Sequence, residues 1–524
     1  MTLVSLIIAW QTVLPAYYFY FVYRMKRPNP EIEIPQDWRV AMVVTKAPSE
    51  PWSVVQKTLE AMLAQNHPHD TWLADELPQS DPIQWCKERD IKISSRQGIA
   101  AYHQPTWPRR TRCKEGNLAY FYDMYGYDQY DVVVQLDADH VPEPGYLEAM
   151  IRPFVDPKVG YVAAPSICDA NADDSWVVNA RAYAEGSMHG SLQAGYNDGW
   201  APLCIGSHYA VRVAAVRDIG GLGPELAEDH STTLMMNAHG WRGVFAFDAE
   251  AHGDGPASFP DFLVQEFQWS RSLTTLLLSV TPKYWQGLTP RLKFQFAFAQ
   301  LWYPLYAISL GLGMLLPVIA LARDTPWVNV TYVGFILHAL VLDVACIGVV
   351  SWINRQGWFR PKEARVVSWE TLLFQLSRWP WILAGVLNAL LAWILSKELP
   401  FRVTPKGAKS GRPLPIRVMS PYFTLALISA IVVILVSDVQ KATGYYFLAI
   451  LNAAFYAALC GAIVYAHLKE NYPQKPKYPK LQIHRAAIWA TLGLLFVAIC
   501  VRGQEALYGV TADSFLKPSL LNTN

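Results

Sequence analysis

Hydrophobic and polar positions divide the chain into an apolar N-terminal segment, a long mixed region and a mainly apolar C-terminal half. Residues 3–23 are almost entirely apolar and are followed by Arg24, Lys26 and Arg27. A cleaved signal peptide carries its basic residues before the apolar run, so the reverse order predicts a retained membrane helix with its N-terminus outside. The basic flank then places the following residues in the cytosol.

The mixed region from about 36 to 258 alternates between short β-branched runs and segments with helical periodicity. Strands are expected at 39–45 and 71–75, and a helix at 53–65 lies between them. This alternation is typical of an α/β domain that is built on a mostly parallel sheet.

The clearest chemical signal in the mixed region follows the apolar run at 132–136, which predicts a buried strand. Asp137 and Asp139 come directly after this run, so both carboxylates emerge where the strand meets its loop. Open α/β sheets bind ligands at this end of their strands. Two carboxylates at this spacing suit a hard divalent ion that keeps positions open for phosphate oxygens. A solvated Asp-rich turn is the alternative interpretation.

Long apolar runs dominate beyond residue 290, at 294–322, 328–353, 379–396, 418–438, 444–467 and 485–501. Basic connectors favour the cytosolic side of a membrane. All basic connectors become cytosolic if 366–397 lies along the interface, and the polar start of this segment and Pro380 agree with that placement. Six spans with both termini outside are therefore expected, and a re-entrant or seventh span is the alternative.

Composition supports a membrane protein without a nucleic-acid partner. Of the 524 residues, 52% are hydrophobic and only 17% are charged, and 20 are Trp, as in chains with several membrane spans. The formal net charge of +1 gives no reason to expect nucleic acid. The seven cysteines show no metal-binding spacing, which fits a reducing cytosolic face.

The segment LDADHVPEPGYL at 136–147, with further motifs described below, resembles processive family-2 glycosyltransferases, most closely the bacterial cellulose synthase group. The similarity covers about residues 38–410. It implies an α/β domain of the GT-A (Rossmann-like) type fused to an all-α membrane bundle. The implied domains are an N-terminal membrane helix (1–27), a cytosolic glycosyltransferase domain (36–258), interfacial helices with a QxxxW motif (259–290), and a channel bundle (291–524) that includes interfacial helix 366–397 and a gating loop at 400–412.

The resemblance assigns residues to the binding of a UDP-sugar donor. Asp139 would hold the divalent ion, Asp137 would lie close to the ribose and the ion, and Lys114 in CKEGNL would meet the diphosphate. Asp75 stands where the family contacts uridine, although Glu76 replaces the family's second Asp. The remaining donor-side residues are Glu50, Gln265, Arg271, and Thr404 and Lys406 of the gating-loop motif FRVTPKG.

The resemblance also assigns the catalytic carboxylates. Ala227-Glu228-Asp229 stands in place of the family's Thr-Glu-Asp, and Asp229 would be the general base that takes the proton of the acceptor hydroxyl. Glu228 is the second carboxylate of this motif. A simple helix cap is the alternative role for Asp229.

The acceptor sugar would stack on Trp269 of QEFQW, near Cys204 and Gly206 of the CIGS loop. An interfacial membrane tryptophan is the alternative for Trp269. The family has Arg where this chain has Gln268, and Arg271, three residues further on the same helical face, could supply the missing charge. Alternatively, Arg271 reaches toward lipid headgroups.

The resemblance therefore implies an inverting, processive hexosyltransferase of the plasma (inner) membrane, which extends a β-glucan from UDP-glucose and translocates it. Alternative products are β-1,3-glucan, mixed-linkage glucan, chitin or hyaluronan. A non-processive enzyme that loads a lipid carrier belongs to a different class, as does a non-catalytic export subunit, which Gln268, Ala227 and Glu76 would favour. No regulatory PilZ domain is expected after the bundle, and accessory subunits are left open.

Overall fold

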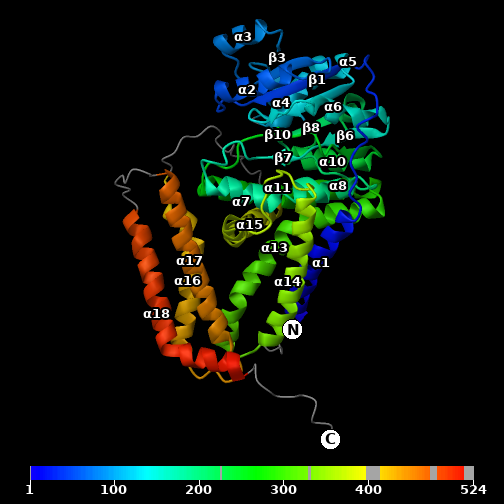
Figure 1. The fold of residues 1–524 in the computed structure, drawn as a ribbon. Coiled ribbons are helices and arrows are strands. Elements are labelled where there is room, and N and C mark those ends of the chain that lie inside the picture. Colours follow the sequence, from blue (N-terminus) through cyan, green and yellow to red (C-terminus); the bar gives the residue numbers. More distant parts are fainter. Residues whose placement is uncertain are drawn as a thin grey trace.

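The computed structural model describes residues 2–111, 113–224, 227–327, 332–396, 413–471 and 481–512. Figure 1 shows an α/β domain at one end and long helices at the other, with a layer of transverse helices between them. This arrangement confirms the predicted fold class of a GT-A-like domain joined to a bundle of long apolar helices. The exact domain boundaries stay predictions.

The α/β domain contains a seven-stranded sheet in the order β3-β2-β1-β4-β8-β6-β9. Its strands are β1 (Val40–Lys46), β2 (Asp70–Asp75), β3 (Lys92–Ser94), β4 (Val132–Leu136), β6 (Val159–Ala163), β8 (His208–Arg212) and β9 (Arg242–Phe245). The first four strands are mutually parallel, whereas β8 runs antiparallel to both β4 and β6. The residues just before β8 lie beside the C-terminal end of β4, because the Asp137 N–H donates to Ser207 O over 2.7 Å. From this point β8 runs in the direction opposite to β4.

A second, three-stranded sheet lies next to the end of β4. It consists of β5 (Val141–Pro142), β10 (Ala251–His252) and β7 (Ser166–Ile167), in that order across the sheet. The loop that contains Asp137 and Asp139 runs from β4 directly into β5. Both ends of this loop are therefore held by strand pairing.

Helices cover both faces of the large sheet. Side chains of a strand alternate between the two faces, so the buried strands present apolar residues on each. On one face, Met42 and Val44 pack with Val55 and Leu59 of α2. On the other face, Val43 packs with residues of α4. The helices of this domain are α2 (Trp52–Leu63), α3 (Ser80–Lys87), α4 (Lys114–Phe121), α5 (Tyr127–Gln129), α6 (Tyr146–Ile151), α7 (Trp176–Glu185), α8 (Gln193–Tyr196), α9 (Val213–Asp218) and α10 (Glu228–Ala238).

Five helices among the described residues are long and apolar enough to cross a membrane. They are α1 (Thr2–Val22), α13 (Pro290–Arg323), α16 (Ile416–Leu435), α17 (Tyr445–Asn471) and α18 (Leu481–Ala512). The chain therefore joins an α/β domain to several helices of membrane-spanning length and composition. A further long helix, α14 (Tyr332–Arg355), covers most of the span predicted at 328–353 but is not among these five, so the sixth span stays a prediction.

Transverse helices connect the two parts of the molecule. Figure 1 shows α7 and α11 (Phe259–Thr275) lying across the long helices, and α15 (Trp369–Ile394) is seen nearly end-on. Glu266 of α11 and Arg378 of α15 form a buried ion pair of 2.7 Å between Oε2 and Nη2. The short helix α12 (Thr281–Tyr284) follows toward α13. The interfacial placement of 366–397 agrees with the transverse direction of α15 and stays a prediction.

Candidate active site

Four segments that are distant in the sequence meet at the ammonium group of Lys114. Lys114 begins α4, and its Nζ donates to Asp137 Oδ1 over 2.8 Å and to Gly206 O over 2.5 Å. Glu228 Oε1, in the first turn of α10, lies 3.8 Å from the same nitrogen. The sequence motifs that contain these residues therefore form one cluster at the C-terminal end of β4.

Electrostatics keeps Lys114 charged in this cluster. Burial lowers the pKa of Lys114, but the carboxylates of Asp137 and Glu228 more than offset that effect, so its pKa lies above the usual value. Because an ammonium is a compact charge, Lys114 can compensate carboxylates on two sides at once.

Asp229 and Glu228 lie side by side at the N-terminus of α10, where Glu228 is buried and Asp229 is half-buried. Burial raises the pKa of Asp229 to about 6, although hydrogen bonds from backbone N–H groups and the charge of Lys114 oppose this rise. Burial, with Asp229 and Asp137 nearby, also raises the pKa of Glu228 well above its usual value. A Cβ at Gly206 would lie only 3.3 Å from Asp229 Oδ2, so the glycine lets the CIGS loop approach this carboxylate closely.

Asp137, Asp139 and His140 can each offer a ligand atom to one metal ion, because these atoms lie within 4.8 Å of one another. Asp139 Oδ2 accepts from the Asp254 N–H over 3.2 Å, and Asp139 Oδ1 lies 3.2 Å from His140 Nδ1. Carboxylate oxygens are the ligands that Mg²⁺ and Mn²⁺ prefer. The residues therefore fit the predicted divalent ion, and His140 is a candidate ligand that the sequence interpretation left out.

The predicted uridine residue Asp75 lies at the end of β2, next to β1 in the sheet. Its Oδ1 accepts from the Leu77 N–H over 2.9 Å and pairs with Lys46 Nζ at 3.2 Å. Glu76 instead forms an ion pair with the fully buried Arg96. Glu50 Oε2 accepts from the Ala47 N–H over 2.7 Å, which gives this residue at least a local role in the loop after β1.

Two of the predicted substrate residues on α11 gather around Arg181 of α7. The Arg181 guanidinium lies 4.5 Å from the centroid of the Trp269 ring, and Arg181 Nη1 donates to Gln265 Oε1 over 3.2 Å. Arg181 also pairs with Glu185 at 3.0 Å between Nε and Oε2. No motif marks Arg181 in the sequence, because its contacts arise only when α7 packs on α11.

The remaining predicted site residues differ in what the structure says of them. Cys204 is buried, and its N–H donates to Thr233 Oγ1 over 3.1 Å, which ties the CIGS loop to α10. Gln268 and Arg271 are three residues apart on α11 and therefore lie on neighbouring positions of one helical face. Both are buried, at 7% and 6% exposure. Their contact with the donor stays a prediction. Thr404 and Lys406 lie outside the described residues.

Comparisons with known proteins identify a matching family and several relatives. A family model described as "Glycosyl transferase family group 2" matches residues 132–460. The chain is 24% identical over 264 residues to the cellulose synthase catalytic subunit [UDP-forming] of Pseudomonas fluorescens (strain SBW25), which covers 48% of this chain and 34% of that protein. It is 25% identical over 271 residues to cellulose synthase 2 of Novacetimonas hansenii, with 50% of this chain and 16% of that protein covered. The chain thus spans about a third or less of the length of these relatives.

Solved structures with a similar fold include a mannosyltransferase of Pyrobaculum calidifontis in complex with GDP-Man and Mn²⁺. It has 14% sequence identity and a TM-score of 0.46, and covers 73% of this chain and 96% of that one. A glucosyl-3-phosphoglycerate synthase of Mycobacterium tuberculosis, in complex with Mn²⁺ and UDP, has 12% identity and a TM-score of 0.28, and covers 42% of this chain and 73% of that one.

Proposed function

Because the chain belongs to glycosyl transferase family group 2, we propose that it is an inverting, processive transferase that polymerises a β-glucan from UDP-glucose and translocates the product across the plasma membrane. The observation that supports this most strongly is the meeting of Lys114, Asp137, Glu228 and Asp229 at one end of β4. A donor side with carboxylates that could hold a metal ion thus adjoins the half-buried carboxylate of Asp229, whose pKa is raised.

On the donor side, Lys114 binds the diphosphate and Asp75 orients the uridine. Asp137 and Asp139 would hold Mg²⁺ or Mn²⁺, which when bound supplies positive charge beside the phosphate oxygens. A phosphate at Lys114 competes with Asp137 for the ammonium, so donor binding and release of Asp137 from its ion pair are coupled. Glu50, Gln265, Arg271, Thr404 and Lys406 complete the proposed donor contacts.

On the acceptor side, Asp229 acts as the general base. The acceptor hydroxyl attacks the sugar C1, its proton moves to the Asp229 carboxylate, and the C1–O bond to UDP breaks so that the electron pair leaves with UDP. A single displacement of this kind inverts the configuration at C1. The raised pKa of Glu228 favours the neutral form of this second carboxyl group, which limits repulsion as Asp229 works beside it.

Trp269 binds the face of the acceptor sugar, and Cys204 and Gly206 form the loop beside it. Aromatic rings and sugar faces are complementary because the C–H groups of the sugar pack against the apolar π face of the ring. Arg181 covers the Trp269 ring in this structure. The acceptor sugar therefore either packs on the face of the Trp269 ring opposite to Arg181 or displaces the Arg181 guanidinium when it binds.

Purified full-length protein in lipid vesicles tests the proposal. Each of UDP-glucose, UDP-N-acetylglucosamine and UDP-glucuronate is supplied with Mg²⁺ or Mn²⁺, and UDP release and product length are measured. UDP-glucose should give a polymer that a β-1,4-glucanase digests. A chitinase- or hyaluronidase-sensitive polymer would assign a different monomer, a β-1,3-glucanase-sensitive one a different linkage, and a single glycolipid would contradict processivity. No UDP release from any donor would contradict the enzyme itself.

A further inference from the structure

The residue that follows the proposed general base faces a candidate membrane span. His230 is the third residue of α10, after Glu228 and Asp229, and it is only 6% exposed. Its imidazole meets the ring of Phe296 on α13 at a right angle, with 5.6 Å between the two centroids. Because α13 is among the five helices that are long and apolar enough to cross a membrane, His230 joins the first turn of α10 to that bundle.

Two side-chain hydrogen bonds fix the orientation of the His230 ring. The amide nitrogen of Gln300, one helical turn beyond Phe296 on α13, lies 3.2 Å from His230 Nε2. The carbonyl oxygen of the same amide accepts from Thr281 Oγ1 of α12 over 2.9 Å. An amide nitrogen donates and does not accept, so His230 Nε2 is the acceptor and the proton of the neutral imidazole lies on Nδ1. Gln300 and Thr281 are both buried, and together they hold the ring in place.

His230 contributes geometry rather than charge to its neighbour Asp229. Burial alone lowers the pKa of His230 to about 4, whereas the pKa of Asp229 is about 6. The imidazole is therefore neutral wherever the Asp229 carboxylate is ionised. The titratable groups that interact with Asp229 are Glu228 on α10, Lys114 on α4, Cys204 in the CIGS loop and Tyr209 on β8.

We propose that Gln300 of α13 is a positioning residue for the general base Asp229, a role that rests on the proposed function. Asp229 Oδ1 accepts from the His230 N–H over 2.7 Å, and the Asp229 carbonyl accepts from Thr233 Oγ1 over 2.9 Å. The backbone of this turn thus determines where the carboxylate points, and the fixed His230 ring holds the turn against α13. A general base must lie within hydrogen-bond reach of the proton that it takes, so a displaced turn slows the reaction.

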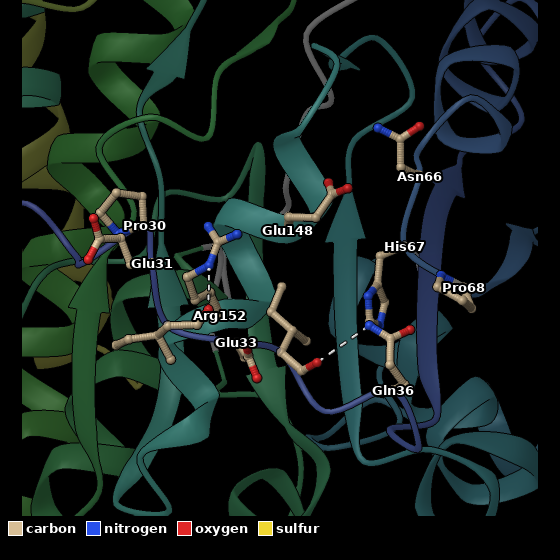
Figure 2. A pocket seen from close by; sticks show the side chains of 11 residues that line it. Pro30, Glu31, Glu33, Gln36, Asn66, His67, Pro68, Glu148 and Arg152 are labelled. Atoms are coloured by element: carbon tan, nitrogen blue, oxygen red, sulfur yellow. Dashed lines mark hydrogen bonds between the residues drawn. The ribbon is translucent and has the colours of Figure 1, made fainter.

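Two other contacts fasten the α/β domain to the segments that lead into the long helices, and neither involves Asp229. Gln295 of α13, also buried, exchanges two hydrogen bonds of 2.9 and 2.7 Å with the backbone of Ala201. Arg152 Nε donates to Ile32 O over 3.0 Å at the end of α6, beside the surface pocket that Figure 2 shows, and so holds the linker that follows α1. Gln295 and Arg152 therefore provide matched controls.

The variant Gln300→Leu, in full-length protein in lipid vesicles, tests the positioning role with the UDP-sugar that the wild type uses. Turnover per folded protein should fall about 10²-fold, whereas KM for the donor and the Kd of UDP should stay unchanged, because Lys114 is not disturbed. The acidic limb of the pH profile should move below pH 6, because water reaches a loosened Asp229 and burial then raises its pKa less. Gln295→Leu and Arg152→Gln should lower the thermal unfolding midpoint but leave turnover and the acidic limb unchanged.

Variants of His230 separate the hydrogen bond from the bulk of the ring. In His230→Gln the new amide oxygen can accept from Gln300, so most of the turnover should remain. His230→Leu should lose as much turnover as Gln300→Leu. The variant with both leucines should be no slower than either single variant, because the two changes remove the same contact.

Three results would overturn the positioning role: wild-type turnover in Gln300→Leu, additive losses in the double variant, or an equal loss in Gln295→Leu. Asp229→Asn, measured on the same preparation, separates this role from the proposed function. If Asp229→Asn is slow and Gln300→Leu is not, only the positioning role is refuted. If Asp229→Asn retains full turnover, the assignment of the base is refuted as well.

Discussion

At the scale of single residues, Lys114 connects the donor and acceptor sides of the candidate site. Its ammonium lies 2.8 Å from Asp137 Oδ1 and 3.8 Å from Glu228 Oε1. Without this charge, Asp137, Glu228 and Asp229 would face one another with no ammonium between them, and mutual repulsion would disfavour their ionised forms. Lys114 therefore supports the ionised form of Asp229 even before any donor is present.

Replacing Asp229 by Asn should lower turnover by about 10²–10⁴-fold, the usual contribution of a general base. The amide cannot take the proton of the acceptor hydroxyl, whereas UDP binding on the opposite side of Lys114 should be retained. Single-turnover sugar transfer and UDP titration on the same preparation measure both effects. Turnover within a few-fold of the wild type would remove Asp229 from the role of base.

Turnover should also fall as the pH drops through about 6. The pKa of Asp229 is raised to about 6 by burial, so the carboxylate is ionised above this pH and protonated, and hence inactive as a base, below it. A log–log pH profile of turnover should therefore show a slope of about one on its acidic limb. The residual activity of Asp229→Asn serves as the control, since it should lack this limb.

Replacing Asp139 by Ala should abolish metal-dependent UDP binding, because a hard cation next to two phosphates then loses a carboxylate ligand. Titration of UDP with and without Mn²⁺ measures the effect. His140→Ala, at the neighbouring candidate ligand, should weaken metal dependence less, because both carboxylates remain. Undiminished metal-dependent affinity in Asp139→Ala would refute the assignment.

The sequence predicted the site residues whose chemistry is tied to a local motif, and it missed those that only packing brings in. Asp137 and Asp139 follow a recognisable strand, and Glu228 and Asp229 begin a helix. The local sequence therefore indicates where each motif lies in the fold. Arg181 is 84 residues from Gln265, and its contacts depend on how α7 crosses α11, which no local pattern records. His140 was readable as a neighbour of Asp139, but an imidazole next to a carboxylate is not by itself a ligand signal.

At the scale of elements, α11 is held against α15 by a contact that requires glycine. A Cβ at Gly385 of α15 would clash with Ser270 Oγ and Phe267 O of α11. The buried pair of Glu266 and Arg378 lies in the same interface. Because α11 also carries Gln265 and Trp269, the packing of α15 positions residues of the candidate site.

Gly385→Ala should therefore destabilise the protein by about 1–3 kcal/mol, the usual effect of overpacking a close interface. It should also lower turnover, because α11 must shift to accept the methyl group. Thermal unfolding of the protein in detergent, together with sugar transfer at a permissive temperature, measures both. Gly313→Ala on α13 is the matched control, since its Cβ would meet nothing within 4 Å. An unchanged midpoint for Gly385→Ala would contradict the close packing.

At the scale of the whole molecule, the transverse helices determine how the α/β domain faces the long helices (Figure 1). Apolar runs and their lengths were sufficient to predict α13, α16 and α17 to within a few residues, whereas α18 extends well beyond the predicted end at residue 501. Length alone could not distinguish α15 from a span, since its 26 residues are long enough to cross a bilayer, although α15 is not among the five candidate spans. The basic residues on either side of it favour the interfacial placement, because they restrict which loops share a compartment, and this placement stays a prediction.

The membrane topology of the segment after α15 gives a prediction about the molecule as a whole. A reporter inserted at Lys409 should show a cytosolic location, because Lys406, Lys409, Arg412 and Arg417 form a basic connector that favours this side. A reporter at Lys441, in the short connector between α16 and α17, should show an external location and serves as the control. An external signal at Lys409 would mean that α15 crosses the membrane. The gating-loop role of Thr404 and Lys406 would then fail with it, because that role needs the loop on the same side as Lys114 and the UDP-sugar.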